Sequence, residues 1–154
     1  MIKEGEPVPD VKLTGLDGQT ISPRDFRGQI LVLYFYPKDD TTGCTREAQD
    51  FTALAGEFQK VGTWVLGVSK DEPGRHRKFI DKYDLKVALA SDVDGHVCEA
   101  FGSWIEKNLY GRKYMGIDRS TFLIDRNGRI HRIWRKVKVA GHAQEVLAAA
   151  RALD

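Results

Sequence analysis

The chain has 154 residues, of which 42% are hydrophobic and 30% charged, and its formal net charge at pH 7 is +2. This length is typical of one domain with a buried core, so we expect a single domain over residues 1–154. The small net charge favours no particular partner, and no apolar run approaches the length of a membrane span. We expect neither nucleic acid nor a membrane as a partner.

The first third of the chain predicts a hairpin, a single helical turn and a buried strand. Asp17-Gly18 lies between two short apolar segments, as in a hairpin turn, and residues 22–26 have a capping serine followed by proline. Residues 31–36, L-V-L-Y-F-Y, are uncharged and too few for a typical helix. They predict a buried strand that Pro37 ends, because proline cannot donate to a strand ladder.

A polar loop follows the strand, and a helix is expected to begin around Cys44. Thr41, Thr42 and Gly43 are candidates for its N-cap, and Gly62 marks its end. Its apolar residues recur with the 3.6-residue period of one helix face: Ala48, Phe51, Leu54, Ala55 and Phe58.

The position of Cys44 indicates two opposite fates for its thiol. In the first helical turn it would lie among unpaired backbone N–H groups, which favour the thiolate, the nucleophilic form of cysteine. A lone cysteine is otherwise most often a small buried hydrophobe. From position alone, both interpretations stay open.

The middle of the chain predicts further alternation of strands and helices. Residues 63–69 and 87–90 are strand candidates on either side of a helix over 72–83. That helix would bury Phe79, Ile80 and Tyr83, while His76 and Arg77 would form a solvated face. A turn at 92–95 then leads into a short helix that carries Cys98, and residues 104–114 are expected to be irregular.

The last third predicts a hairpin and a closing helix. Residues 120–125 and 129–139 are its strands, and Asn127-Gly128 is its turn. A helix should open at Gly141, with Val146, Leu147 and Leu153 facing inward. Basic residues gather on the second strand, where they are more typical of a solvated or edge-protecting face than of nucleic-acid binding. They are Arg129, His131, Arg132, Arg135, Lys136 and Lys138.

Alternation of strands and helices indicates parallel pairing, whereas a tight hairpin indicates antiparallel pairing. We therefore predict an α/β fold with a mixed central β-sheet flanked by helices.

Three blocks of sequence resemble the peroxiredoxins. F-Y-P-K-D-D-T-T-G-C-T-R-E contains their active-site pattern, in which Pro37, Thr41 and Cys44 have the family's spacing. Residues 116–125, G-I-D-R-S-T-F-L-I-D, and residues 136–143, K-V-K-V-A-G-H-A, extend the likeness over nearly the whole chain. The sequence is most similar to the bacterioferritin comigratory protein (PrxQ) subfamily, and this resemblance implies a thioredoxin-like fold.

The resemblance implies a thiol peroxidase with Cys44 as the peroxidatic cysteine. The Thr41 hydroxyl would contact peroxide and thiolate, Arg119 would favour the anion, and Pro37 would shield the pocket. Backbone N–H groups at Gly43 and Cys44 are further donor candidates. The products would be a sulfenic acid at Cys44 and a hydroxide or alkoxide.

Each supporting residue also has an interpretation without catalysis. Thr41 could be only an N-cap, and Arg119 an ordinary charge at the start of a strand. Glu47 could fix Arg119 through an ion pair, or only complement the dipole of the helix.

The sequence departs from the subfamily where a second, resolving cysteine is often found. Gln49 occupies one such position, five residues after Cys44, and the predicted helix over 72–83 contains no cysteine. Cys98, the other thiol, has the setting of a buried, inert residue. We therefore expect a one-cysteine mechanism with an external thiol reductant, and keep Cys98 as the alternative resolving thiol.

The sequence thus predicts reduction of hydrogen peroxide and small organic hydroperoxides, with thioredoxin, glutaredoxin/glutathione or another thiol as reductant. A peroxide-sensing protein and a thiol–disulfide oxidoreductase are the rival functions, and the lack of a C-x-x-C motif argues against the second. We expect no cofactor and no metal. The N-terminal residues lack the apolar segment of a secretory signal, so a cytoplasmic location is expected, and the subfamily suggests a monomer.

Overall fold

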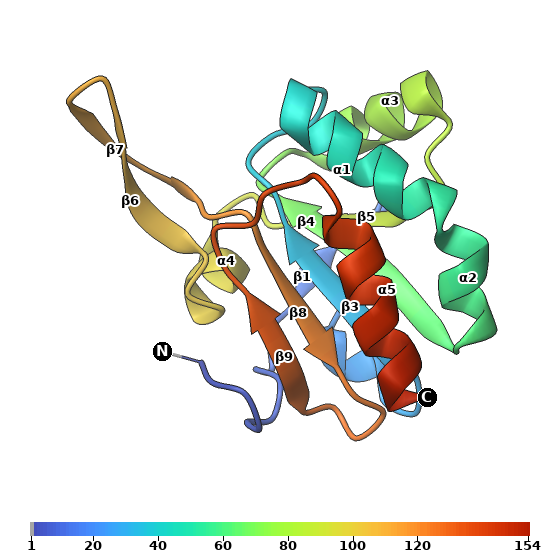
Figure 1. The fold of residues 1–154 in the computed structure, drawn as a ribbon. Coiled ribbons are helices and arrows are strands. Elements are labelled where there is room, and N and C mark those ends of the chain that lie inside the picture. The colour runs from blue at the N-terminus through green and yellow to red at the C-terminus, as the bar shows by residue number, and fades with distance from the viewer. Residues whose placement is uncertain (1) are drawn as a thin grey trace.

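The computed structural model describes residues 2–154, and within them a seven-stranded sheet forms the centre of the molecule (Figure 1). The strand order is β2-β1-β5-β4-β3-β8-β9. The strands are β1 Leu13–Thr14, β2 Thr20–Ile21, β3 Ile30–Phe35, β4 Thr63–Ser69, β5 Ala88–Ser91, β8 Ser120–Ile124 and β9 Ile130–Trp134.

The sheet is mixed, as predicted. Strand β3 pairs in parallel with β4, which pairs in parallel with β5, and these strands are joined by helical crossovers. Strand β8 is antiparallel to both β3 and β9, and β1 is antiparallel to β2 and β5. Leu33 of β3 lies between Leu66 of β4 and Phe122 of β8, so the strand that precedes Cys44 is central and fixed from both sides.

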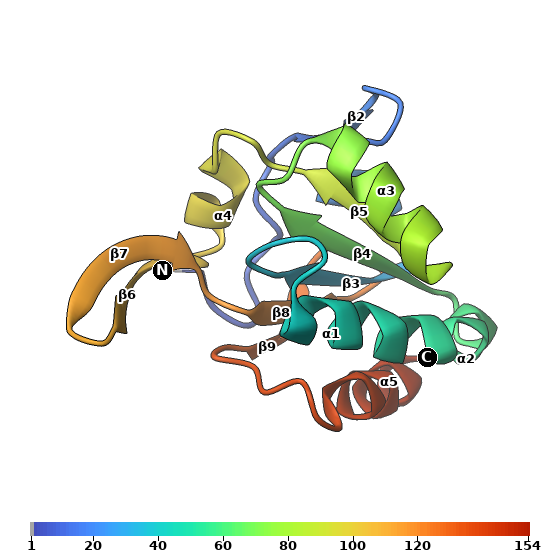
Figure 2. The same ribbon diagram turned by 90° about the horizontal axis from the view of Figure 1, so that it is seen from above.

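Helices cover both faces of the sheet (Figure 2). None within residues 2–154 is long and apolar enough to cross a membrane. The helical segments are η1 Pro23–Phe26, α1 Thr42–Ala53, α2 Ala55–Lys60, α3 Pro73–Tyr83, α4 His96–Ala100 and α5 His142–Leu153.

Strand β3 separates two hydrophobic cores, because successive side chains of a strand point to opposite faces. Ile30, Val32 and Tyr34 pack into a core with residues of α1, α2, α3 and α5. Leu31, Leu33 and Phe35 pack into the other core, with α4 and the N-terminal segment. All six β3 side chains are buried, which explains the uninterrupted apolar run in the sequence.

The prediction that residues 104–114 are irregular is wrong. They belong to an antiparallel hairpin of β6 Trp104–Leu109 and β7 Arg112–Ile117, which projects from the body (Figure 1). Tyr110 and Gly111 both have positive φ, at 53° and 79°, as a tight hairpin turn requires. Most of the hairpin's side chains are exposed or half-buried, so the sequence lacks the alternation that reveals a half-buried strand.

Two boundaries and the burial of one residue also differ from the prediction. The expected single helix after Cys44 breaks at Leu54, whose φ of −102° and ψ of 6° separate α1 from α2. Strand β9 ends at Trp134 rather than at Val139, because the chain then leaves the sheet toward α5. The prediction that His76 is solvated is also wrong: it is fully buried, although its neighbour Arg77 is exposed.

Candidate active site

Cys44 lies in the first turn of α1, directly after the loop that leaves β3. Thr41 occupies the N-cap position with extended backbone, and its carbonyl accepts the N–H of Thr45 at 2.8 Å. The first backbone N–H groups of any helix lack an intrahelical acceptor, and here they surround a thiol that is only 2% exposed. The predicted place of Cys44 at the start of a helix is therefore confirmed.

Arg119 connects Cys44 with Glu47. Its Nη2 lies 3.3 Å from the Cys44 Sγ, and its Nη1 donates to Glu47 Oε1 at 2.7 Å. Cys44 and Glu47 are three residues apart on α1, so both face the same neighbour. Arg119 reaches them from the turn before β8, where its carbonyl accepts the N–H of Val137 at 2.9 Å.

The carboxyl group of Glu47 is held in an apolar setting. Its side chain is 1% exposed, and its Oε2 has no hydrogen-bond partner among residues 2–154. Burial raises the pKa of Glu47 from 4.5 to about 7, although the Arg119 guanidinium acts in the opposite direction. Burial lowers the pKa of Arg119, but the charges of Glu47 and Cys44 outweigh it, so the guanidinium stays charged.

Gly43 makes room for this arginine. A Cβ atom at Gly43 would lie 3.2 Å from Arg119 Nη2, tighter than an ordinary van der Waals contact. The glycine between Thr42 and Cys44 therefore lets the guanidinium reach the sulfur. Sequence reasoning treated Gly43 only as a cap and a backbone donor.

The other two predicted site residues lie on the loop itself. Thr41 and Pro37 are both exposed. The Thr41 hydroxyl does not cap the helix but donates to the Lys38 carbonyl at 2.8 Å. Because its proton is engaged there, the lone pairs of Thr41 Oγ1 can accept a hydrogen bond from a bound molecule.

The two cysteines lie on opposite faces of the sheet. Cys44 packs in the core that contains α1 and α3, whereas Cys98 packs in the core that contains α4. Cys98 is fully buried, and burial raises the pKa of its thiol far above the usual range, with a further contribution from Asp92. Gln49 is exposed on α1.

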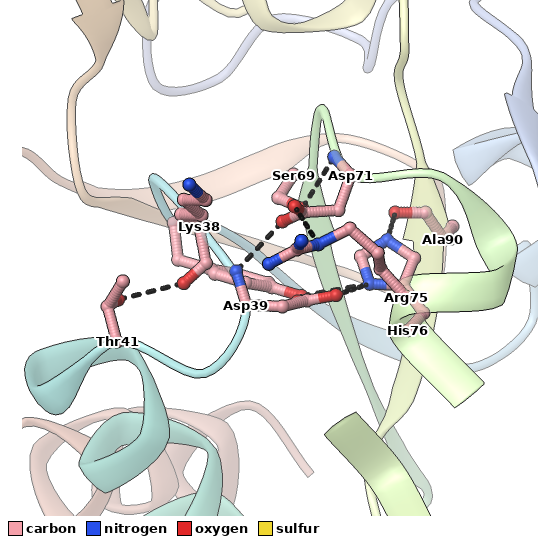
Figure 3. Close-up of polar contacts among 9 residues, drawn as sticks. Lys38, Asp39, Thr41, Ser69, Asp71, Arg75, His76 and Ala90 are labelled. Atoms are coloured by element: carbon pink, nitrogen blue, oxygen red, sulfur yellow. Dashed lines mark hydrogen bonds and ion pairs between the residues drawn. The ribbon is translucent and has the colours of Figure 1, made fainter. Parts of the chain in front are cut away.

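Sequence reasoning missed a buried polar network directly behind the loop (Figure 3). Asp39 of the loop and His76 of α3 are both buried, with 2.7 Å between Asp39 Oδ2 and His76 Nδ1. A signal for His76 was present, because it precedes Phe79, Ile80 and Tyr83 at the spacing of one helix face.

Lys107 of β6 was also overlooked. Burial lowers its pKa, and Arg119 acts in the same direction, while Asp118 and Cys44 oppose them. The projecting hairpin thus brings an additional amino group toward the site.

One cluster has the composition of a metal site. Ligand atoms of Asp92, Asp94 and His96 lie within 4.8 Å of one another. The Asp92 carboxylate accepts the backbone N–H groups of Val97 and Cys98, at 3.2 and 2.8 Å. This arrangement satisfies the start of α4 and needs no ion.

Comparisons with known proteins agree with the resemblance in the sequence. The profile of the AhpC/TSA family matches residues 5–133. A putative peroxiredoxin bcp of Coxiella burnetii is 47% identical over 146 residues, 95% of this chain and 97% of that protein. Peroxiredoxin Bcp of Bacillus subtilis is 45% identical and covers 95% of this chain and 93% of its own length.

A solved structure has the same architecture. It is the bacterioferritin comigratory protein of Xanthomonas campestris, described for its alkyl peroxide reduction activity. The TM-score is 0.90 at 45% sequence identity, and the match covers 97% of this chain and 98% of the other.

Proposed function

We propose that Cys44 is the peroxidatic cysteine of this chain, which belongs to the AhpC/TSA family as a peroxiredoxin of the Bcp (PrxQ) type. The protein is therefore a thiol-dependent peroxidase with a thioredoxin-like fold. The residues that carry the reaction and the course of its second half are inferred from the geometry of this chain, whereas the reductants are those that the family suggests.

In the proposed first step, the Cys44 thiolate attacks one oxygen of a peroxide. A sulfur–oxygen bond forms as the oxygen–oxygen bond breaks, and the attacked oxygen remains on Cys44 as the sulfenic acid. The other oxygen leaves as hydroxide or alkoxide and takes a proton from water. The alkyl peroxide reduction of the X. campestris relative supports organic hydroperoxides, besides hydrogen peroxide, as substrates.

The observation that carries this proposal is the arginine between two acidic groups. Arg119 Nη2 lies 3.3 Å from the sulfur, so a thiolate at Cys44 would have a cation as its direct partner. Glu47 fixes the guanidinium from the other side at 2.7 Å, which leaves it already oriented before peroxide arrives. Preorganised charge of this kind often makes the largest contribution to catalysis.

The loop would supply the remaining contacts. Thr41 Oγ1, whose proton is engaged by Lys38, would accept a hydrogen bond from the peroxide. The N–H groups of Gly43 and Cys44 would donate to the oxygen on which charge develops. Pro37 would limit access of water to the thiolate from the loop side.

The second half-reaction is proposed to need an external thiol. The sheet separates Cys44 from Cys98, and neither exposed Gln49 nor α3 offers a nearer cysteine. The external thiol would attack the sulfenic sulfur, releasing water and forming a mixed disulfide, and a second thiol would release Cys44. Thioredoxin and glutaredoxin/glutathione are the proposed reductants, with the protein acting as a monomer.

Cys44→Ser and Cys98→Ser form a matched pair for the test. Peroxide consumption is followed for both variants and the wild type, with the thioredoxin and glutathione systems offered separately. We expect Cys44→Ser to be inactive and Cys98→Ser to retain most of the wild-type rate.

Two observations would contradict the proposal. A Cys44–Cys98 disulfide, found by non-reducing mass spectrometry after one equivalent of peroxide, would refute the one-cysteine mechanism. Consumption that stops after one equivalent, despite excess of either reductant, would favour a sensor over an enzyme.

A further inference from the structure

The buried pair of Asp39 and His76 joins the active-site loop to α3, and no step proposed above uses it (Figure 3). Asp39 lies midway between Pro37 and Thr41, and its side chain is 1% exposed. His76 is fully buried, with Nδ1 facing Asp39 Oδ2 at 2.7 Å and Nε2 facing the Ala90 carbonyl at 3.0 Å. The pair therefore connects the loop, α3 and β5 through one imidazole ring.

The partners of His76 fix where its protons lie. A carbonyl oxygen only accepts, so Nε2 must carry a proton toward Ala90. The short contact between Nδ1 and Asp39 then requires a single proton between them, whichever group holds it. Tyr36 donates its hydroxyl proton to Asp39 Oδ1. The pair is thus neutral as a whole and satisfied on every side, as a buried polar group must be.

Two further carboxylates fasten the same loop. The N–H of Asp39 donates to Asp71 Oδ2 at 2.8 Å, and the Ser69 hydroxyl orients that carboxylate at 2.7 Å. Asp40, in the left-handed region with a φ of 58°, accepts from Tyr83 at 2.6 Å and from Lys82 at 2.9 Å. Of these ties, the Asp39–His76 pair is the one wholly removed from water.

We propose that the Asp39–His76 pair positions the loop for peroxide reduction. It holds Pro37–Thr41 against α3, so that the Thr41 hydroxyl and the N–H groups at the start of α1 converge on one point. Neither residue touches the sulfur or the peroxide, so both are positioning residues. The inference rests on the proposed function, and it assigns a role to two residues to which the resemblance gave none.

A positioning role for the Asp39–His76 pair predicts an effect on reactivity that a purely structural role does not predict. Attack on peroxide needs the thiolate and the converging donors, whereas alkylation by iodoacetamide needs only the thiolate and access to a sulfur that is 2% exposed. Loosening the loop should therefore slow the reaction of Cys44 with peroxide without slowing its alkylation. General destabilisation would alter both rates together.

His76→Asn and His76→Gln form the matched pair for this experiment. The amide of asparagine occupies the place of Nδ1 and can donate to Asp39, while that of glutamine occupies the place of Nε2 and can donate to Ala90. We expect His76→Asn to keep most of the peroxide rate. We expect His76→Gln to lower it by roughly tenfold to a hundredfold, as misplaced catalytic groups do.

If His76→Gln does not fold, the same comparison can be made from the loop side. Asparagine at position 39 can accept from Tyr36 and donate to His76, whereas alanine can do neither. Asp39→Asn should therefore react with peroxide faster than Asp39→Ala, and neither should be alkylated more slowly than the wild type.

The inference would be overturned if the two variants of whichever pair folds reacted with peroxide at equal rates. It would also be overturned if the peroxide and iodoacetamide rates fell in parallel. A wild-type protein that consumes no peroxide would instead refute the proposed function itself.

Discussion

Replacing Arg119 with methionine should slow the reaction of Cys44 with peroxide by roughly two to three orders of magnitude. Opposite unit charges 3.3 Å apart interact by about 5 kcal/mol at an effective dielectric constant near 20. The arginine side chain is 17% exposed, so water screens part of that energy. A remaining loss of about 3–4 kcal/mol corresponds to the expected decrease in rate.

The protein should tolerate this change. Arg119 lowers the pKa of Glu47 against the effect of burial, so without it the carboxyl group takes a proton and leaves no buried unpaired charge. Arg119→Lys is the matched variant, because it keeps the charge but cannot bridge Glu47 and Cys44 at once. Its rate should lie between those of wild type and Arg119→Met.

The assay is a rapid-mixing measurement of the second-order rate constant with hydrogen peroxide, read as sulfenic acid at Cys44 by trapping and mass spectrometry. Far-ultraviolet circular dichroism and thermal melting establish that the variants are folded. A folded Arg119→Met protein that reacts as fast as the wild type would refute the role given to the guanidinium.

Three other substitutions test the packing around the site. Because burial raises the pKa of Glu47 from 4.5 to about 7, its carboxyl binds a proton more tightly in the native state than in the unfolded chain. The stabilisation that Glu47 contributes is complete below its unfolded-state pKa of 4.5, and it falls by about 3 kcal/mol as the pH rises through the native pKa of about 7. The difference between wild type and Glu47→Gln in urea unfolding should show that fall, and a difference independent of pH would contradict it. Gly43→Ala should displace Arg119 and slow peroxide reduction roughly tenfold, while the free energy of unfolding stays equal or rises by up to about 1 kcal/mol. An unchanged peroxide rate in Gly43→Ala would show that the close approach of Arg119 to position 43 does not matter. Gly67→Ala would place a Cβ 2.6 Å from Tyr34 Cζ and should lower the free energy of unfolding by about 1–3 kcal/mol, which a wild-type urea midpoint would disprove.

The strand–loop–helix unit could be predicted because its signals are local. The charge-free run before Pro37 and the helical period after Cys44 each specify one element, and β3 and α1 form as expected. The contact between Arg119 and Glu47, 72 positions apart, needed the family resemblance, because no local pattern relates a turn before one strand to a helix far upstream.

The errors arose where distant segments decide the environment. The spacing of His76 places it on the apolar face of α3, but its polarity favours exposure. Asp39 and the Ala90 carbonyl, which lie on other elements, provide the partners that make its burial favourable. The β6–β7 hairpin is stabilised by pairing between its own strands rather than by a buried face, and only the turn at Tyr110-Gly111 could have indicated it.

The separation of the two hydrophobic cores by β3 also determines how this enzyme could be re-engineered. A second thiol can serve as an internal partner for Cys44 only if it is introduced in the compartment that contains α1 and α3. In the proposed one-cysteine mechanism, Cys98 lies in the other core and takes no part, so exchanging it should leave the reaction unaltered. On that mechanism, oxidation would be confined to one sulfur, and the protein would serve as a scaffold that records a single oxidation event without a disulfide within the chain.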